Sequence, residues 1–380
     1  MNSFVKKISK YYKRLDKPLL VAVTLCALFS VLLLYSLYAT GTADIEARYY
    51  IIQLVSTFLG IGAALIIASL DYHHFTKLWF LYIPASLALI ALTFTSLGMQ
   101  RAGADDRAWL NIGFTSMQPS EFLKLSFILS FSYHLHKDQE NINHPLHLLF
   151  ILIHGAIPIG IVALQGDYGT ALVFLVMFVT MLFSAGLSFK YIIAALVITP
   201  PAIYLLWNYV LQSLHKKRIM VLIHPGTDPM GLEYQQNLGL SALRSGKLFG
   251  NGFFSDKFVE VPEIHNDFMF AHIGQTCGFV GAVITIGVLA YICIKVLNDS
   301  RKTMDLLGKL ICMGTFAMLF IHCFMNIGMV LKVMPVIGIP LPFFSAGGTA
   351  LLSMYIAIGF VLSCYSHNEK RYRMFYDIEQ

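Results

Sequence analysis

The stretch PLLVAVTLCALFSVLLLYSLYAT, residues 18–40, decides the fold class of this chain. It contains no charged residue, and it is long enough to cross the hydrocarbon layer of a bilayer as a helix, which takes about 20 residues. Because lipid offers the backbone no hydrogen-bond partners, a spanning segment of this kind must be helical.

Comparable apolar blocks recur along the whole chain. They lie at residues 49–70, 79–97, 120–135, 146–164, 170–187, 190–212, 268–297, 307–333 and 346–366. Only 13% of the residues are charged and 57% are hydrophobic, whereas a soluble domain carries about 25% charged residues. We therefore predict an all-α integral membrane protein, a single polytopic domain over residues 1–380 with about ten transmembrane helices.

The distribution of lysine and arginine predicts the orientation. Basic residues gather before the first block, after the eighth and tenth blocks, and in three short connections: Lys6, Lys7, Lys10, Lys13, Arg14, Lys17, Lys295, Arg301, Lys302, Lys309, Lys370, Arg371, Arg373, Lys77, Lys137 and Lys190. An even number of spans puts all of these on one side, and cytoplasmic loops are enriched in such residues. Both termini are therefore expected in the cytoplasm. The first block is too long for a cleavable signal and reads as a retained helix.

The cysteines and histidines do not form a recognisable metal motif. The six cysteines lie in or at the ends of the apolar blocks without a CxxC pair, which fits neither a disulfide framework nor a zinc site. Several histidines fall in connections expected in the cytoplasm, where we interpret them as solvated loop residues: His73, His74, His134, His136, His144 and His147.

Two longer polar connections are expected on the external side. One spans residues 98–119. The other, residues 213–267, is a large extracytoplasmic loop between the seventh and eighth helices, and loops of that size are usually functional. Its charges are balanced, which argues against a simple patch for anionic lipid. Its glycines and the amphipathic stretch 234–243 predict a loop folded onto the membrane face.

Ionisable residues at membrane depth are costly and need a partner or a function. Glu121 and Lys124 stand three residues apart on one helical face, so they can form an ion pair that anchors the helix end. Asp167 can cap the sixth helix. Lys332 precedes three prolines, which indicates a broken or re-entrant segment. Asp267 can either cap the eighth helix or act as a general base, because burial raises the pKa of a carboxyl group.

These segments together resemble the SEDS family (shape, elongation, division and sporulation), the membrane glycosyltransferases that polymerise peptidoglycan. The matching motifs run in order along the chain: Arg107-Ala-Trp-Leu110, Gln118-Pro-Ser-Glu121 with Lys124, Gln165-Gly-Asp-Tyr-Gly-Thr170, Arg218, Asp228-Pro229, Tyr234-Gln235, Pro262-Glu263, Asp267-Phe268, Asn326-Ile-Gly328, Leu341-Pro-Phe-Phe-Ser345 and Gly347-Gly348. Within the family the chain resembles RodA, the elongation and rod-shape member. The sequence Pro335-Val-Ile-Gly338 lacks the Thr-Lys pair that the division member FtsW tends to carry.

The chain departs from the family pattern at several positions. Gln275 and Thr276 stand where two adjacent glutamates are usual, and His272 is an additional titratable group. Other departures are Gly166, Leu238, Lys247 and Ala346. The missing glutamates put in doubt any metal or proton-relay role for that pair, but they leave Asp267 unaffected.

The resemblance implies the reaction and the substrate. The acceptor 4-hydroxyl of lipid II would attack the anomeric carbon of a lipid-linked glycan strand, with inversion and release of undecaprenyl pyrophosphate. Asp267 matches the family's essential aspartate and would be the catalytic base or orient the acceptor. Arg218, helped by Lys216 and Lys217, would hold the pyrophosphate. Glu121, Lys124, Asp167 and Ser345 would complete the substrate cavity.

The resemblance also implies a bacterial cytoplasmic (inner) membrane location, with the active site on the outer face. The expected partners are a class B penicillin-binding protein (a transpeptidase) and other elongation-complex proteins, and no nucleic acid. No ligand set demands a metal, although a divalent cation such as Mg²⁺ or Mn²⁺ could share the charge of the pyrophosphate. Three alternatives stay open: a lipid II flippase or transporter, a division-type polymerase, and a non-catalytic scaffold.

Overall fold

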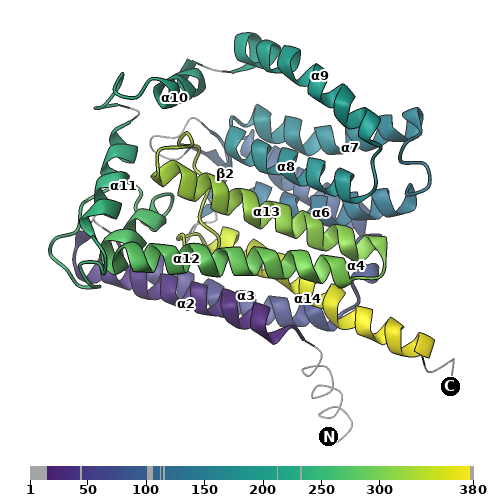
Figure 1. Ribbon diagram of the computed structural model, residues 1–380, viewed down its shortest axis with the longest axis horizontal. Coiled ribbons are helices and arrows are strands. Elements are labelled where there is room, and N and C mark those ends of the chain that lie inside the picture. The colour runs from purple at the N-terminus through teal and green to yellow at the C-terminus, as the bar shows by residue number, and fades with distance from the viewer. Residues whose placement is uncertain are drawn as a thin grey trace, which may run out of the picture.

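The computed structural model describes residues 15–42, 45–100, 106–111, 113, 116–211, 213–231 and 233–376. Lys6, Lys7, Lys10, Lys13 and Arg14, which carry part of the orientation argument, lie outside the described residues. The protein is predominantly helical, and Figure 1 shows most of its long helices running side by side along the long axis of the molecule.

Each apolar block of the sequence coincides with helical structure. The helices are α2 (Lys17–Ala39), α3 (Arg48–Ser69), α5 (Trp79–Thr93), α6 (Pro119–Lys137), α7 (Pro145–Leu164), α8 (Tyr168–Ser184), α9 (Phe189–Leu205) with the π-helical turn η2 (Leu206–Val210), α12 (Met269–Lys302), α13 (Leu306–Val330) and α14 (Gly348–Tyr376). Within the described residues, seven helices are long and apolar enough to cross a membrane, and α5 and α8 are apolar but shorter. The prediction of an α-helical, multi-pass membrane protein is confirmed.

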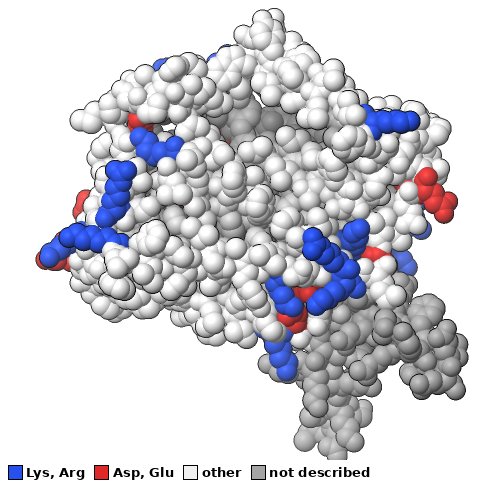
Figure 2. Space-filling view, in the orientation of Figure 1, with Lys and Arg blue, Asp and Glu red and all other residues white. Residues whose placement is uncertain are grey.

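The charged side chains lie toward the two ends of this bundle. Figure 2 shows Lys, Arg, Asp and Glu gathered near both ends of the long axis, with a band free of their colours between them. Such a band is what lipid requires, because a charged side chain facing hydrocarbon costs several kcal/mol. The short helix α4 (Tyr72–Lys77) lies at one end, and α11 (Tyr234–Ser245) lies at the other (Figure 1).

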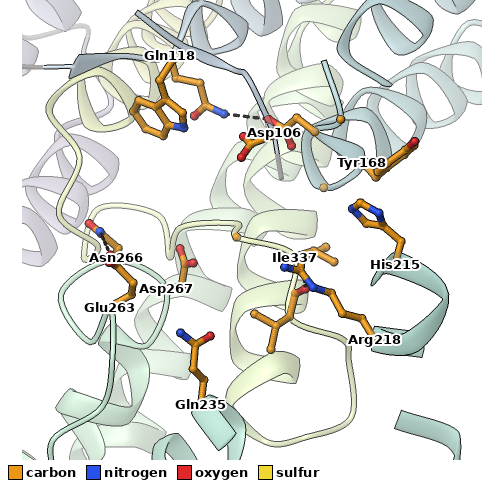
Figure 3. A pocket seen from close by; sticks show the side chains of 16 residues that line it. Asp106, Gln118, Tyr168, His215, Arg218, Gln235, Glu263, Asn266, Asp267 and Ile337 are labelled. Carbon is orange, nitrogen blue, oxygen red and sulfur yellow. Dashed lines mark hydrogen bonds between the residues drawn. The ribbon is translucent and has the colours of Figure 1, made fainter. Parts of the chain in front are cut away.

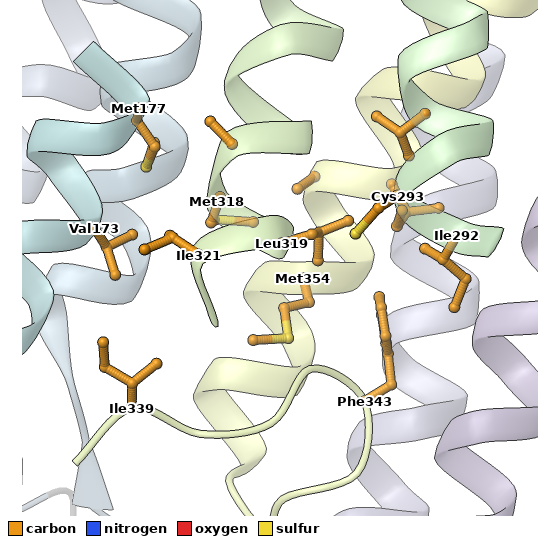
Figure 4. Packing of buried hydrophobic residues seen from close by; sticks show 14 of the residues in the cluster. Val173, Met177, Ile292, Cys293, Met318, Leu319, Ile321, Ile339, Phe343 and Met354 are labelled. Atoms are coloured by element: carbon orange, nitrogen blue, oxygen red, sulfur yellow. The ribbon is translucent and has the colours of Figure 1, made fainter. Parts of the chain in front are cut away.

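Helix α13 forms the centre of the bundle. It packs against α6, α8, α12 and α14, while α14 also packs along α3. Figure 4 shows Met318 and Ile321 of α13 among side chains of α8, α14 and the segment that follows α13. No Asp, Glu, Lys or Arg occurs between Lys309 and Lys332. A helix that is apolar on all sides is best placed where protein rather than water surrounds it.

The end of the bundle opposite α4 carries the irregular structure. A three-stranded antiparallel sheet, β1 (Gly98–Met99), β2 (Trp109–Asn111) and β3 (Ser116–Met117), has the order β1-β2-β3 and pairs Gly98 with Leu110 and Leu110 with Met117. The large loop contains α10 (Ser213–Ile223) and α11. The amphipathic stretch 234–243 falls within α11, which lies across the end of the bundle and packs on α12 and α13 (Figure 1).

Helix α12 is broken in its N-terminal third, a feature that the sequence does not predict. Gly278 has φ of 69° and ψ of −166°, and the backbone of residues 247–252 fills the break. Its hydrogen bonds satisfy the groups that the break exposes: Asn251 N to Gln275 O (2.9 Å), Gly252 N to Thr276 O (3.0 Å), Phe279 N to Lys247 O (2.8 Å) and Val280 N to Leu248 O (3.1 Å). The second break was predicted: residues 331–347 are not helical, and Leu341, Phe343 and Phe344 within them are buried in the bundle.

The histidines expected in solvated loops behave in two ways. His74 and His144 are exposed, as predicted. His73 instead lies between two aspartates, with Nδ1 2.7 Å from Asp71 Oδ1 and Nε2 3.1 Å from Asp305 Oδ2, and the Asp305 hydrogen bond raises the pKa of its imidazole. His134 and His136 belong to the last turn of α6, and His134 Nδ1 lies 2.9 Å from His154 Nδ1. His147 belongs to the first turn of α7, with Nδ1 3.1 Å from Asp138 Oδ2. The prediction of solvated loop residues was therefore wrong for His73, His134, His136 and His147.

Candidate active site

A polar cavity of about 210 Å³ opens at the end of the bundle that includes α11. Three walls carry most of its polar side chains: the segment before α12, the first helix of the large loop, and the turn between α7 and α8 with the strand region before α6 (Figure 3). The start of α11 and the segment after α13 complete the lining. Its lining residues are Asp106, Trp109, Gln118, Gly166, Asp167, Tyr168, Gly169, His215, Arg218, Gln235, Glu263, Asn266, Asp267, Val336, Ile337 and Gly338.

Asp267 lies on the first wall, in a turn that the bundle holds at two points. Asn326 of α13 donates from Nδ2 to the Asp267 carbonyl and to the Ile339 carbonyl, both at 2.8 Å. The Ser345 hydroxyl donates to the Asn266 carbonyl. The N-cap of α12 is Phe268 and not Asp267, so capping does not account for the carboxylate. Its side chain is half-buried and lines the cavity beside Gly338.

Arg218 lies on the second wall, across the cavity from Asp267 (Figure 3). Its Nη1 donates to the Val336 carbonyl at 3.2 Å, which ties α10 to the segment after α13. One turn earlier on α10, His215 packs edge-on against Tyr168 with ring centroids 4.4 Å apart. Lys216 and Lys217 do not line the cavity, because neighbouring positions on a helix point in different directions.

Asp167 lies on the third wall and has two functions in the fold. Its Oδ1 accepts from Thr170 N (2.8 Å), so it caps α8 as predicted, and its Oδ2 accepts from Gln118 Nε2 (2.9 Å). The pKa of the Asp167 carboxyl is raised to about 6, because burial and the charge of Asp106 raise it by more than the hydrogen bond from Thr170 lowers it. This wall also carries the indole of Trp109.

The structure does not bring Glu121 and Lys124 to the cavity. They form an ion pair of 2.9 Å with side chains only 2% and 1% exposed, inside the bundle and not at its surface. Ser353 Oγ donates to Glu121 Oε2 (2.6 Å), and His322 Nε2 lies 3.1 Å from Lys124 Nζ. His322 Nδ1 is 3.2 Å from the Pro340 carbonyl. The network therefore supports, from inside the bundle, the segment after α13, which lines the cavity.

Ser345 is likewise a buried support and not a lining residue. Besides its bond to Asn266, its Oγ accepts from Leu341 N at 2.8 Å. The segment after α13 is anchored a second time through Lys332, whose Nζ donates to Glu233 Oε2 (3.2 Å) and to Asn237 Oδ1 (2.6 Å). Although burial acts in the opposite direction, backbone N–H groups and Lys332 hold the pKa of the Glu233 carboxyl below its usual value.

Gln275 and Thr276, which replace the usual glutamates, are buried beneath the large loop. Gln275 Oε1 accepts from Val259 N at 3.0 Å, and its Nε2 lies 3.1 Å from His272 Nδ1. The pair therefore holds the loop down and does not reach the cavity. Across the part of the chain that the structure describes, no group of three His, Cys, Asp or Glu residues could hold a metal ion.

Sequence reasoning missed several lining residues. Trp109 and Gln118 belong to motifs used in the sequence analysis. Nothing in the neighbouring sequence indicates that they line the same cavity as Asp167, which is distant in sequence. Asp106, His215, Gln235, Glu263 and Asn266 were also missed. Their common feature is a position in one of the two long polar connections, residues 98–119 and 213–267, which hold many other polar residues.

Fold and cavity together define a multi-pass membrane protein with a polar site at one end of its helical bundle. The family model FTSW_RODA_SPOVE, described as "Cell cycle protein", matches residues 16–370, and the chain belongs to this family.

Curated relatives include peptidoglycan glycosyltransferase MrdB of Escherichia coli (strain K12), which is 30% identical over 76% of this chain and 78% of its own length. Stage V sporulation protein E of Bacillus subtilis (strain 168) is 30% identical over 91% of this chain and 95% of its own length. Among solved structures, a chain reported under "Structural coordination of polymerization and crosslinking by a peptidoglycan synthase complex" gives a TM-score of 0.78 at 24% identity, covering 93% of this chain and 98% of that one. The crystal structure of the Thermus thermophilus rod shape determining protein RodA gives 0.66 at 24% identity, covering 92% of this chain and 96% of that one. These likenesses establish the shared fold.

Proposed function

We propose that this protein is a peptidoglycan glycosyltransferase that polymerises lipid II during cell elongation, with the cavity as its active site. Family membership and the relatives named peptidoglycan glycosyltransferases support the activity. The observation that carries the site assignment is the position of Asp267, a half-buried carboxylate on one wall with the Arg218 guanidinium on the opposite wall (Figure 3).

The two side chains match the two ends of the reaction. The acceptor 4-hydroxyl oxygen forms a bond to the anomeric carbon of the donor, and its proton passes to Asp267. The bond between that carbon and the pyrophosphate breaks, and undecaprenyl pyrophosphate leaves with the electron pair. Attack from the face opposite the leaving group inverts the anomeric centre.

Arg218 is suited to the growing charge on the leaving group. A guanidinium has five donors in a fixed plane, and one of them is committed to the Val336 carbonyl. The others remain on a side chain whose position is already fixed, so little reorganisation is needed as charge develops. Asp167 and Gln118 on the third wall, with the Trp109 ring, form a polar and aromatic surface suited to a sugar.

The orientation and partners follow from the same proposal. Basic connections in the cytoplasm put the cavity on the outer face of the bacterial inner membrane, where lipid-linked precursors are polymerised. A class B penicillin-binding protein and other elongation-complex proteins would act with it, since crosslinking must follow polymerisation.

A polymerisation assay with fluorescent lipid II tests this function and separates it from transport. Purified protein with its cognate transpeptidase should produce a ladder of glycan strands, and Arg218→Ala should reduce it far more than Lys217→Ala does. Movement of lipid II between leaflets of a vesicle without any ladder would instead support the flippase reading and overturn the proposal.

A further inference from the structure

One short segment of the chain connects the two walls that carry Asp267 and Arg218. Residues 334–339 follow the end of α13, and Val336, Ile337 and Gly338 within them line the active-site cavity. We call residues 334–339 the bridging segment. It is neither helix nor strand, and side chains from three elements hold it, each by donating to a different backbone carbonyl.

The end of the bridging segment near Asp267 is held by Asn326 of α13. The Asn326 Nδ2 donates to the Ile339 carbonyl and to the Asp267 carbonyl, both at 2.8 Å. Gly338 lies beside the carboxylate, because a Cβ at this position would be 3.8 Å from Asp267 Oδ2. This end of the segment is therefore fixed relative to Asp267.

The other end of the bridging segment is held by Gln236 of α11, which does not itself line the cavity. Its Nε2 has two N–H groups, and it donates to the Met334 carbonyl at 2.9 Å and to the Met329 carbonyl, in the last turn of α13, at 3.0 Å. The side chain is only 4% exposed, so water would not replace these bonds if the amide were removed. Two residues after Met334, the Val336 carbonyl accepts from Arg218 Nη1. Gln236 thus fixes the end of the segment that binds Arg218.

Helix α11 is itself packed against the wall that carries Asp267. Gly239 is three residues after Gln236, on the same face of α11, and it packs against the ring of Phe268, which follows Asp267 directly. A Cβ at Gly239 would lie 2.6 Å from Cδ1 of that ring, so glycine permits this close approach. A continuous series of contacts therefore links Asp267, through α11 and the bridging segment, to Arg218.

We propose that Gln236 is a positioning residue, which holds Arg218 at the distance from Asp267 that glycosyl transfer requires. This inference rests on the proposed function, in which Asp267 receives the acceptor proton while Arg218 binds the departing pyrophosphate. Without the Gln236 amide, one end of the bridging segment and the guanidinium bound to it can shift. A misplacement of about 1 Å can lower a rate about 100-fold. Because Gln236 does not line the cavity, its effect passes through Arg218.

Gln236→Met tests this role, because methionine has a similar length and no hydrogen-bond donor. With purified protein, its cognate transpeptidase and fluorescent lipid II, we expect kcat to fall about tenfold and KM to stay within about twofold. Ser241→Met, at an exposed position of the same helix, is the matched control and should keep the wild-type kcat. Gln236→Asn, whose shorter amide cannot reach both carbonyls, should lower kcat by a smaller factor, and it takes the place of Gln236→Met if that variant does not fold.

A double variant separates positioning from general loosening of the structure. In an Arg218→Ala background, Gln236→Met should slow polymerisation by less than about twofold, since the side chain that Gln236 positions is already gone. Hydrogen exchange gives a readout that does not depend on activity. The amides of Val333 and Met334 donate to the Gly328 carbonyl at 2.9 and 3.1 Å. They should exchange at least about tenfold faster in Gln236→Met, while the amides of α7 should not change.

Four results would overturn the proposal. They are a wild-type kcat in Gln236→Met, a rise in KM without a fall in kcat, a full tenfold effect of Gln236→Met in the Arg218→Ala background, and unchanged exchange of Val333 and Met334. Each of them leaves the proposed function standing. Wild-type protein that makes no glycan strands would instead overturn the proposed function and, with it, this inference.

Discussion

The buried ion pair of Glu121 and Lys124 allows a quantitative prediction that separates structural support from substrate binding. Lys124→Met removes the ammonium and leaves the Glu121 carboxylate in the core, where it still accepts a hydrogen bond from the Ser353 hydroxyl. Both side chains are almost fully buried, so the variant should lose about 3–5 kcal/mol of unfolding free energy. The same substitution at Lys137, exposed at the end of the same helix, should cost about 0.5 kcal/mol or less.

The double variant Glu121→Met with Lys124→Met sharpens this test. It removes both charges, and Ser353 keeps a bond to the Ala350 carbonyl at 2.9 Å, so most of the lost stability should return. Unfolding free energy is measured by chemical denaturation in micelles, and KM for lipid II is measured in parallel. A Lys124→Met variant as stable as Lys137→Met, but with a raised KM, would refute the structural assignment and restore the substrate-binding prediction.

Three further predictions concern the supports of the site. Asn326→Leu removes the donor to two buried carbonyls, one of them that of Asp267, so kcat should fall with little change in KM, and unfolding free energy should drop by about 2–4 kcal/mol. Because the pKa of Asp167 is raised to about 6, its ionisation opposes folding, and stability should decline as pH rises from 4 to 6; Asp167→Asn should flatten that slope in thermal melts across this range. Gly278→Ala should lower the unfolding free energy by at least about 1–3 kcal/mol, because φ at this position is 69° and a Cβ would lie 2.4 Å from Gly250 N. Gly287→Ala on the same helix, where a Cβ would meet nothing within 4 Å, should be neutral or stabilising. Resistance to proteolysis measures both variants.

Much of the fold follows from composition and block length. The uncharged stretch 18–40 became α2 within one residue at each end, because lipid leaves an apolar segment no alternative to helix. The break after α13 was also foreseeable, since Pro335, Pro340 and Pro342 follow one another closely there and each removes a backbone donor that a helix would use. The break at Gly278 was not foreseeable. Glycine is common inside helices, and the segment that fills the break, residues 247–252, meets α12 only through the tertiary fold.

The site was predictable only in part. Asp267 and Arg218 emerged from motifs, and the structure places both on the same cavity. Glu121 and Lys124 were predicted at the helix end and at the substrate cavity, but they lie inside the bundle. Their spacing allows the same ion pair at the surface and in the interior, and only the packing of α13 and α14 against α6 determines which of the two forms. Likewise, Asp106 and Gln118 could not be recognised as site residues from sequence, because their interactions with Asp167 arise only in the folded chain.

The central claim is that Asp267 takes part in the chemistry itself. The most direct measurement is the rate of lipid II polymerisation by Asp267→Asn beside Glu263→Gln, a carboxylate that lines the same cavity four residues earlier, with lipid II binding measured for both. We expect Asp267→Asn to bind lipid II normally but to polymerise it at least about 100-fold more slowly, since a positioned base contributes a rate factor of roughly 10²–10⁴. Glu263→Gln should stay within a few-fold of wild type. Polymerisation by Asp267→Asn at the wild-type rate would contradict the account.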